Sequence, residues 1–142
     1  ILDEPVSALD VSVRNQVLNV LVDLRARLGL AILLIAHDLA LVAEVCDRVA
    51  VLLAGRVVEA GPAEDVMLRP LHPHTRFLVQ ATLGGVDAGG GVASPGSQAA
   101  GGPSPCPLRG GCGAATELCE VEPELRQHHD EHRVACYFPD SR

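Results

Sequence analysis

Two adjacent carboxylates, Asp3 and Glu4, stand directly after the apolar pair Ile1 and Leu2 and before Pro5. This order is typical of the exit of a buried strand, where side chains leave the core at a reactive edge. Phosphoryl transfer to water needs a divalent cation near the phosphates and a carboxylate that acts on the attacking water. We expect Asp3 to face the cation, Mg²⁺, and Glu4 to face the water. A solvated acidic turn is the alternative interpretation.

Two further polar side chains, His37 and Asp10, lie where they could act with the acidic pair. His37 follows the apolar run "LAILLIA" (30–36), and Asp10 ends the segment "SALD" (7–10). Their separation of 27 positions leaves room for one helix and one strand. An imidazole N–H at the exit of a neighbouring strand can contact a γ-phosphate oxygen. The structural alternatives are a surface histidine and, for Asp10, a helix N-cap.

The elements that would position these residues can be read from the spacing of apolar side chains. Residues 11–28 have a helical period, with Asp10 or Ser12 as the cap and Gly29 as the end. Residues 30–36 do not alternate, which predicts a parallel strand covered on both faces. The predicted buried stripe of the helix is Val13, Val17, Val20, Leu21, Leu24 and Leu28.

The following segments predict a second helix, a hairpin and two short helices. The second helix starts behind Asp38, and the hairpin "VAVLLAGRVVEAG" turns at 54–56. "PAEDVMLR" and "HPHTRFLVQATL" are helical, with Pro73 in the first turn of the latter. Cys46 is expected in the core without a ligand role. The stripe predicted for the second helix is Leu41, Val42, Val45, Cys46 and Val49.

This order predicts an α/β fold whose first strands are parallel and joined by a crossover helix. Residues 1–83 form the α/β part. Residues 84–105 are almost entirely Gly, Ala, Ser and Pro and predict a flexible linker. Residues 106–142 form a small cysteine-rich tail.

The composition excludes several classes of partner. The net charge is −7 and the 11 basic residues, all arginine, are scattered, so we expect no nucleic-acid partner. The longest apolar stretch, 28–36, is much shorter than a membrane helix, and we expect a cytoplasmic protein. A chain without lysine has no G-x-x-x-x-G-K-[ST] phosphate loop.

"ILDEPVSALD", the helix, the apolar strand and "AHD" together resemble the second half of an ABC-transporter ATPase domain. The resemblance implies a P-loop NTPase fold and ATP as ligand, with Asp3 and Glu4 ending the Walker B motif. His37 is then the switch histidine, and Asp10 is the D-loop residue that faces a second ATPase subunit. Neither the phosphate loop nor an "LSGGQ"-like signature occurs. We therefore expect a carboxyl-terminal fragment that starts at the Walker B motif and is inactive alone.

The later segments resemble the dipeptide and oligopeptide importers of that family. "HPHTR" (72–76) resembles their closing "HPYT-R" segment, with His74 where tyrosine is usual. The tail spacing C-x5-C-x6-C-x16-C, "EPEL" and "HRVAC" resemble their carboxyl-terminal extension. The loop after the first tail cysteine lacks the expected aromatic residue, and Tyr137 replaces a common histidine. The tail cysteines are Cys106, Cys112, Cys119 and Cys136.

Four thiols in a tail of about 35 residues suggest a metal staple, since so short a segment has little core. Thiolates can hold a [4Fe–4S] cluster or a zinc ion. The absence of a C-x2-C pair disfavours a zinc ribbon, whereas His128, His129 and His132 leave a Cys3His zinc site open. The resemblance favours the [4Fe–4S] cluster, with zinc and unligated thiols as alternatives.

The resemblance also implies a function and partners. The intact subunit would hydrolyse ATP on the cytoplasmic face of the membrane to energise import of dipeptides or oligopeptides. It would bind permease subunits and a second ATPase subunit, in a homodimer or heterodimer, and serve an extracytoplasmic peptide-binding protein indirectly. The alternatives are an importer of nickel or another solute and a non-catalytic metal-binding remnant.

Overall fold

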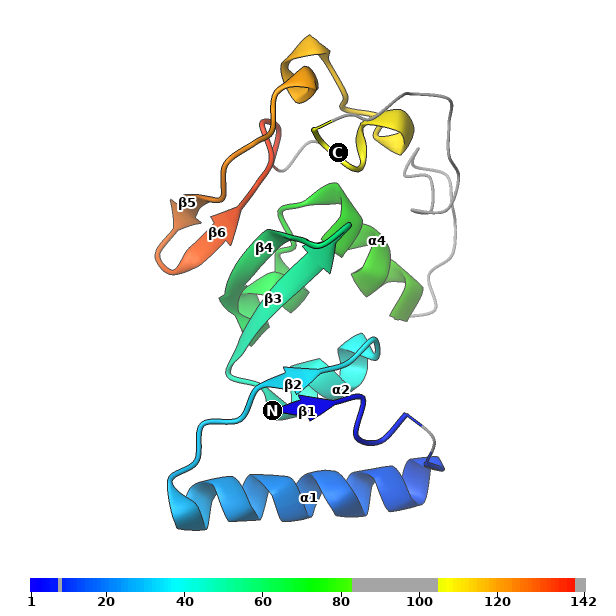
Figure 1. The fold of residues 1–142 in the computed structure, drawn as a ribbon, viewed down its shortest axis with the longest axis vertical. Coiled ribbons are helices and arrows are strands. Elements are labelled where there is room, and N and C mark those ends of the chain that lie inside the picture. The colour runs from blue at the N-terminus through cyan, green and yellow to red at the C-terminus, as the bar shows by residue number, and fades with distance from the viewer. Residues whose placement is uncertain (8, 83–104, 140–142) are drawn as a thin grey trace. The chain divides into compact units, whose positions relative to one another are not determined.

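The computed structural model describes residues 1–7, 9–82 and 105–139, shown as a coloured ribbon in Figure 1. They belong to two compact units, Ile1–Cys46 and Asp47–Arg142. In the described part of the chain, no helix is both long and apolar enough to cross a lipid bilayer.

The first unit contains two short parallel strands and two helices. β1 (Leu2–Asp3) pairs in parallel with β2 (Leu34–Ile35), as predicted for this part of the chain. The Leu2 amide donates to the Leu33 carbonyl at 2.8 Å, and the Glu4 amide donates to the Ile35 carbonyl at 2.9 Å. α1 (Val11–Leu28) forms the crossover between the strands. This connection confirms the predicted strand–helix–strand order.

Side-chain caps fix where both helices of this unit begin. Asp10 accepts hydrogen bonds from the amides of Ser12 and Val13 at 3.1 and 3.0 Å. Gly29, with φ of 63°, closes α1 in the left-handed conformation that glycine tolerates best. Asp38 caps α2 (Leu39–Val45) in the same way as Asp10 caps α1. These starts and the end at Gly29 confirm the sequence predictions.

The face that α1 buries differs from the predicted stripe. The buried residue of this helix is Leu18, which packs with Val6 and Leu41, while Val17 is partly buried beside it. The helix carries apolar residues around much of its circumference, so packing selects the buried face and periodicity alone does not. Four members of the predicted stripe are instead exposed: Val13, Val20, Leu24 and Leu28.

Two further predictions in this unit need correction. The strand predicted over 30–36 shortens to β2, since β1 offers only a two-residue partner. Its two faces also differ, because Leu34 packs on the core while Leu33 and Ile35 are 58% and 48% exposed. The second helix ends at Val45, because the backbone at Cys46 is extended. The predicted stripe therefore stops there, and Val49 belongs to a strand.

The second unit is built on an antiparallel hairpin. β3 (Arg48–Leu53) and β4 (Arg56–Pro62) pair across a two-residue turn, as predicted. Ala54 and Gly55 have φ of 50° and 78°, which matches the turn type favoured by strand twist. Alternate residues of β3 are buried, ending with Leu53. α3 (Ala63–Leu68) and α4 (Pro73–Thr82) follow and confirm the two predicted short helices.

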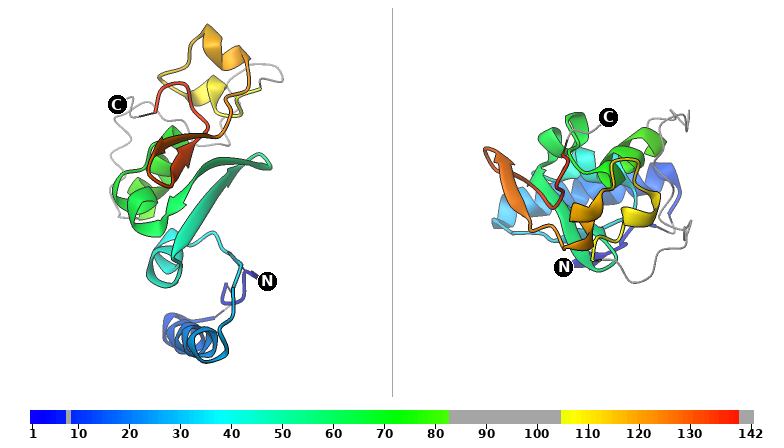
Figure 2. Two further views of the ribbon diagram at one scale, coloured as in Figure 1. Left: turned by 90° about the vertical axis from the view of Figure 1, so that its left-hand side faces the viewer. Right: turned by 90° about the horizontal axis from the view of Figure 1, so that it is seen from above.

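The cysteine-bearing tail continues the sheet of the hairpin. β5 (Arg126–His129) and β6 (His132–Val134) form a second hairpin, and the sheet order is β3-β4-β6-β5. Figure 2 shows this second hairpin beside β4 from two further directions. Two 3₁₀ turns, Arg109–Gly111 and Glu117–Glu120, precede it.

This pairing between the tail and the α/β part was not predicted. The linker predicted over 84–105 lies outside the described residues except for Pro105. The boundaries predicted for it and for the tail remain predictions.

The observed face of α1 can be tested by truncating two leucines. Leu18→Ala should lower the free energy of unfolding by about 2–5 kcal/mol, because it opens a cavity in the core of the first unit. Leu28→Ala is the matched control, since Leu28 is 64% exposed, and should change it by less than about 0.5 kcal/mol. Urea unfolding of this chain measures both. Equal losses would contradict the observed packing.

Candidate functional site

The structure brings Glu4 and His37 together. Both residues follow the ends of the parallel strands β1 and β2, which places them at one edge of the sheet. His37 Nδ1 lies 3.1 Å from Glu4 Oε1, and the two side chains are 73% and 50% exposed. The backbone of Glu4 has a φ of 43°, which is unusual for a non-glycine residue. This carboxylate and imidazole can face one common ligand.

A capped turn holds Glu4 in place. The Glu4 carbonyl accepts hydrogen bonds from the amide and the hydroxyl of Ser7, at 3.3 and 3.1 Å. Val6, next in this turn, is buried in the core. Asp3 is the last residue of β1 and is exposed, in register with Ile35. Asp3 and Glu4 are therefore neighbours at the end of a strand that is anchored on the core.

A second capped turn holds His37. Asp38 caps α2 with one carboxylate oxygen and accepts from Arg14 of α1 with the other, at 2.7 Å. This partly buried ion pair joins the starts of the two helices on either side of the strand edge. The Asp38–Arg14 pair was not predicted from the sequence.

Asp10 lies at the start of α1, where its side chain has a structural role. The Ser12 hydroxyl donates to its carboxylate at 2.6 Å and, with the Val13 amide, lowers the pKa of Asp10. This carboxylate therefore stays ionised at neutral pH. The structure thus supports the N-cap interpretation, which leaves the role toward a second subunit as a proposal.

The four tail cysteines converge on one cavity in the second unit. They line it together with His72 and Pro73 from the start of α4, and the cavity measures about 20 Å³. That volume has room for about one water molecule. Cys46 does not line the cavity and is half-buried at the end of α2. The converging residues are Cys106, Cys112, Cys119 and Cys136.

The sulfur atoms influence one another's protonation. Burial raises the pKa of Cys106 and of Cys136, and the neighbouring thiols raise both further. Thiols of this kind stay protonated at neutral pH until a metal ion displaces the protons. In the described residues, no three His, Cys, Asp or Glu side chains are already arranged around one point to hold a metal ion.

The histidine at this cavity is not one of those expected from the sequence. His128, His129 and His132 do not line it, whereas His72 does. His132 is instead occupied, because its Nε2 lies 2.7 Å from Glu59 Oε1. This arrangement argues against the Cys3His zinc site that the tail histidines left open.

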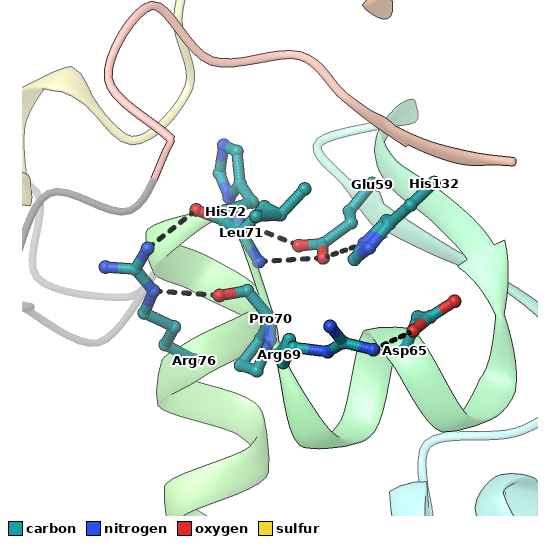
Figure 3. A network of polar contacts seen from close by, with 8 residues as sticks. All are labelled: Glu59, Asp65, Arg69, Pro70, Leu71, His72, Arg76 and His132. Atoms are coloured by element: carbon teal, nitrogen blue, oxygen red, sulfur yellow. Dashed lines mark hydrogen bonds and ion pairs between the residues drawn. The ribbon is translucent and has the colours of Figure 1, made fainter. Parts of the chain in front are cut away.

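Glu59 is the centre of a buried network, shown in Figure 3. Its side chain is fully buried and accepts from the amides of Leu71 and His72 at 2.9 and 2.8 Å, as well as from His132. Arg76 of α4 donates to the carbonyls of Pro70 and Leu71 in the same loop. Figure 3 shows the loop that precedes α4 held between Glu59 and Arg76. All polar atoms of the Glu59 carboxylate have donors.

His72 caps α4 as a neutral imidazole. Its carbonyl accepts from the Arg76 amide at 3.1 Å, and its Nδ1 accepts from the His74 amide at 3.1 Å. Because an amide can only donate, Nδ1 carries no proton and the proton of the neutral ring is on Nε2. Burial, together with the nearby His74 and Arg76, lowers the pKa of His72 to about 4.

Glu59 and His72 were not predicted as site residues from the sequence. A signal for Glu59 exists, since it is a charged residue inside the otherwise apolar strand "VVEAG". For His72 the signal is its place directly before Pro73, where a helix N-cap belongs.

The first unit has an acidic pair at the end of one strand and a histidine at the end of its parallel neighbour, joined by a crossover helix. This α/β arrangement is that of part of an ABC ATPase domain.

Comparison with known proteins identifies the family. No protein-family model matches the chain. A Brucella ovis protein named for peptide import and ATP binding is 45% identical over 94% of this chain and 44% of its own length. The dipeptide transport ATP-binding proteins DppF and DppD of Haemophilus influenzae are 41% and 37% identical over 97% and 98% of this chain, and 44% and 43% of their own lengths. The chain belongs to the peptide-import family of ABC-transporter ATP-binding proteins, and it spans less than half the length of these relatives.

The protonation of His72 predicts a pH dependence of stability. An unfolded chain binds a proton at His72 below about pH 6.5, whereas the folded chain does so only near pH 4. The unfolded state therefore binds more protons in this window, and stability falls as the pH falls from about 6.5 to 4, by up to about 3 kcal/mol.

Denaturant unfolding of the metal-free chain at several pH values measures this effect. His72→Gln removes the titrating group. The variant should therefore lose less stability between pH 6.5 and 4 than the unaltered chain does. His129→Gln is the control, since His129 is an exposed histidine of β5. Identical pH profiles for all three proteins would contradict the assignment.

Proposed function

We propose that this chain is the part of a peptide-importer ATPase subunit that acts on the water during ATP hydrolysis and carries a metal-binding tail. The observation that carries the proposal is the 3.1 Å approach of Glu4 and His37 at the ends of parallel strands. The chain that contains this pair is 37–45% identical to proteins named for peptide import and dipeptide transport. These names favour peptide transport over the nickel-importer and remnant alternatives.

Each residue has a role that follows from its chemistry. Glu4 orients the attacking water and takes its proton, because it is an exposed carboxylate at the end of a strand. His37 donates an N–H to a γ-phosphate oxygen and so reports whether that phosphate is present. Asp3 would hold Mg²⁺, which neutralises charge that develops on the phosphates. Asp10 would face the second ATPase subunit while it caps α1.

The intact subunit would lie on the cytoplasmic face of the membrane and drive permease subunits. An extracytoplasmic peptide-binding protein would deliver the solute to those permeases. The phosphate loop must come from residues outside this chain, because the chain has no lysine. We therefore expect no ATP hydrolysis by these 142 residues alone. The exposed apolar side chains of Leu33 and Ile35 support a further layer that covers this face of the sheet in the intact domain.

The tail cysteines are the proposed site of a [4Fe–4S] cluster. The supporting observation is that four thiols line one cavity, which suits a cluster with one thiolate on each iron. Four thiolates could also hold one zinc ion, which remains the alternative occupant of this cavity. The loops that carry the cysteines must separate to admit a cluster.

The role of Glu4 can be tested in an intact subunit that contains this segment. Glu4→Gln should lower the rate of ATP hydrolysis by about 10²–10⁴-fold, because the water loses its base, while ATP binding stays unchanged. Glu44→Gln, an exposed carboxylate of α2, is the matched control. Turnover and nucleotide affinity are measured separately. Unchanged hydrolysis in Glu4→Gln would refute the role.

The metal site can be tested on this chain purified without oxygen. The unaltered chain should contain about four irons and four sulfides, with a visible absorbance band. Cys119→Ser should lose most of this metal, because Cys119 is buried in the cysteine cavity, whereas Cys46→Ser should keep it. One zinc ion per chain and no visible absorbance would show that the tail cysteines bind zinc and not a cluster. Equal metal content in the two variants would exclude Cys119 as a ligand.

A further inference from the structure

The geometry points to Glu59 as a positioning residue that docks the tail onto the β3–β4 hairpin and so completes the cysteine cavity. The tail is then no independent module, because its metal site needs the start of α4. The docking is argued from the contacts of Glu59 and from the backbone pairing beside it. Only its consequence for metal binding rests on the proposed function.

Glu59 binds two segments that are far apart in the sequence. Two of its donors, the amides of Leu71 and His72, belong to the loop before α4. The third, His132 Nε2, begins β6 of the tail and is 73 positions away. Because backbone amides only donate, Glu59 accepts from Leu71 and His72, and its Oε1 also lies within hydrogen-bond distance of His132 Nε2. One carboxylate thus joins the "HPHTR" and "HRVAC" segments.

The backbone around Glu59 supports the same docking. Glu59 lies opposite Val134 in the β4–β6 ladder, and the Ala135 amide donates to the Val58 carbonyl at 2.8 Å. Gly61 permits this approach, since a side chain there would meet His132 atoms at 3.1–3.3 Å. Ion pairs at the surface, Arg48–Glu131 among them, join the same two parts but contribute little in water.

Both segments held by Glu59 continue directly into the cavity. His72, whose amide binds the carboxylate, lines it together with Pro73. On the tail side, Cys136 directly follows Ala135 and lines the same cavity. If the carboxylate were lost, neither segment would keep its position, because the three donors would be left buried and unpaired.

The first test is amide hydrogen exchange of the full chain. Glu59→Gln replaces one acceptor oxygen with an NH₂ group, which cannot accept from a backbone N–H. The backbone amides of β6 and of Ala135 should therefore exchange at least about tenfold faster than in the unaltered chain. Those of β3 should change less. Glu64→Gln, an exposed carboxylate of α3, is the matched control. Exchange of β6 equal to that of the control would overturn the docking.

A second pair of variants keeps the test decisive if Glu59→Gln does not fold. His132→Leu removes only the tail's donor and should speed exchange in β6, whereas His132→Gln keeps an N–H donor and should restore slow exchange. If His132 only fills space, the amides of β6 should exchange at the same rate in both variants. That result would also overturn the proposal.

The consequence for metal is measured as the rate of iron release to a chelator. Release should be at least about tenfold faster from Glu59→Gln than from Glu64→Gln, since the cavity opens more often. Equal release with fast β6 exchange would refute the link to the metal site while the docking stands. A chain that binds no iron would refute the proposed cluster, and the exchange experiment would still decide the docking.

Discussion

A carboxylate can be buried only where hydrogen-bond donors surround it. In the second unit, the buried Glu59 therefore requires the loop before α4 and His132 to stay beside it. Its side chain has no contact with solvent, and its three donors come from two distant segments. Removing any one donor would leave a buried charge partly unsatisfied, which costs far more than a surface contact. Glu59 therefore contacts both the loop before α4 and the first residue of β6.

This constraint makes the tail part of the sheet. A segment with little apolar core gains stability when its backbone pairs with an existing strand, as β6 does with β4. The cysteine loops then lie against the start of α4, and thiols and a neutral imidazole share one cavity. Burial raises the pKa of Cys106 and of Cys136 and lowers that of His72, so these groups carry no charge there at neutral pH, and Arg109 lines the same cavity.

Local patterns predicted most elements, and non-local contacts explain what was missed. Asp10, Asp38 and Gly29 mark helix ends through bonds to residues within one turn, so the sequence reveals them. The approach of Glu4 to His37 follows from strand order once both strands are parallel. By contrast, the pairing of β6 with β4 joins residues more than seventy positions apart, and no local period contains that information. The buried face of α1 was missed for a related reason, since only the packing of Leu18 on Val6 and Leu41 selects it.

The exposure of Glu4 and His37 limits what they can do in this chain. Both side chains are at least half exposed, so water screens their attraction, and such a pair contributes little by itself. Their usefulness for catalysis depends on a ligand that excludes water from between them, because the same charges interact far more strongly at low dielectric. The capped turns at Ser7 and Asp38 supply the other requirement, since they hold both groups in place before any ligand arrives. The sheet edge thus presents two preorganised groups, whose interaction would strengthen only where a ligand excludes water.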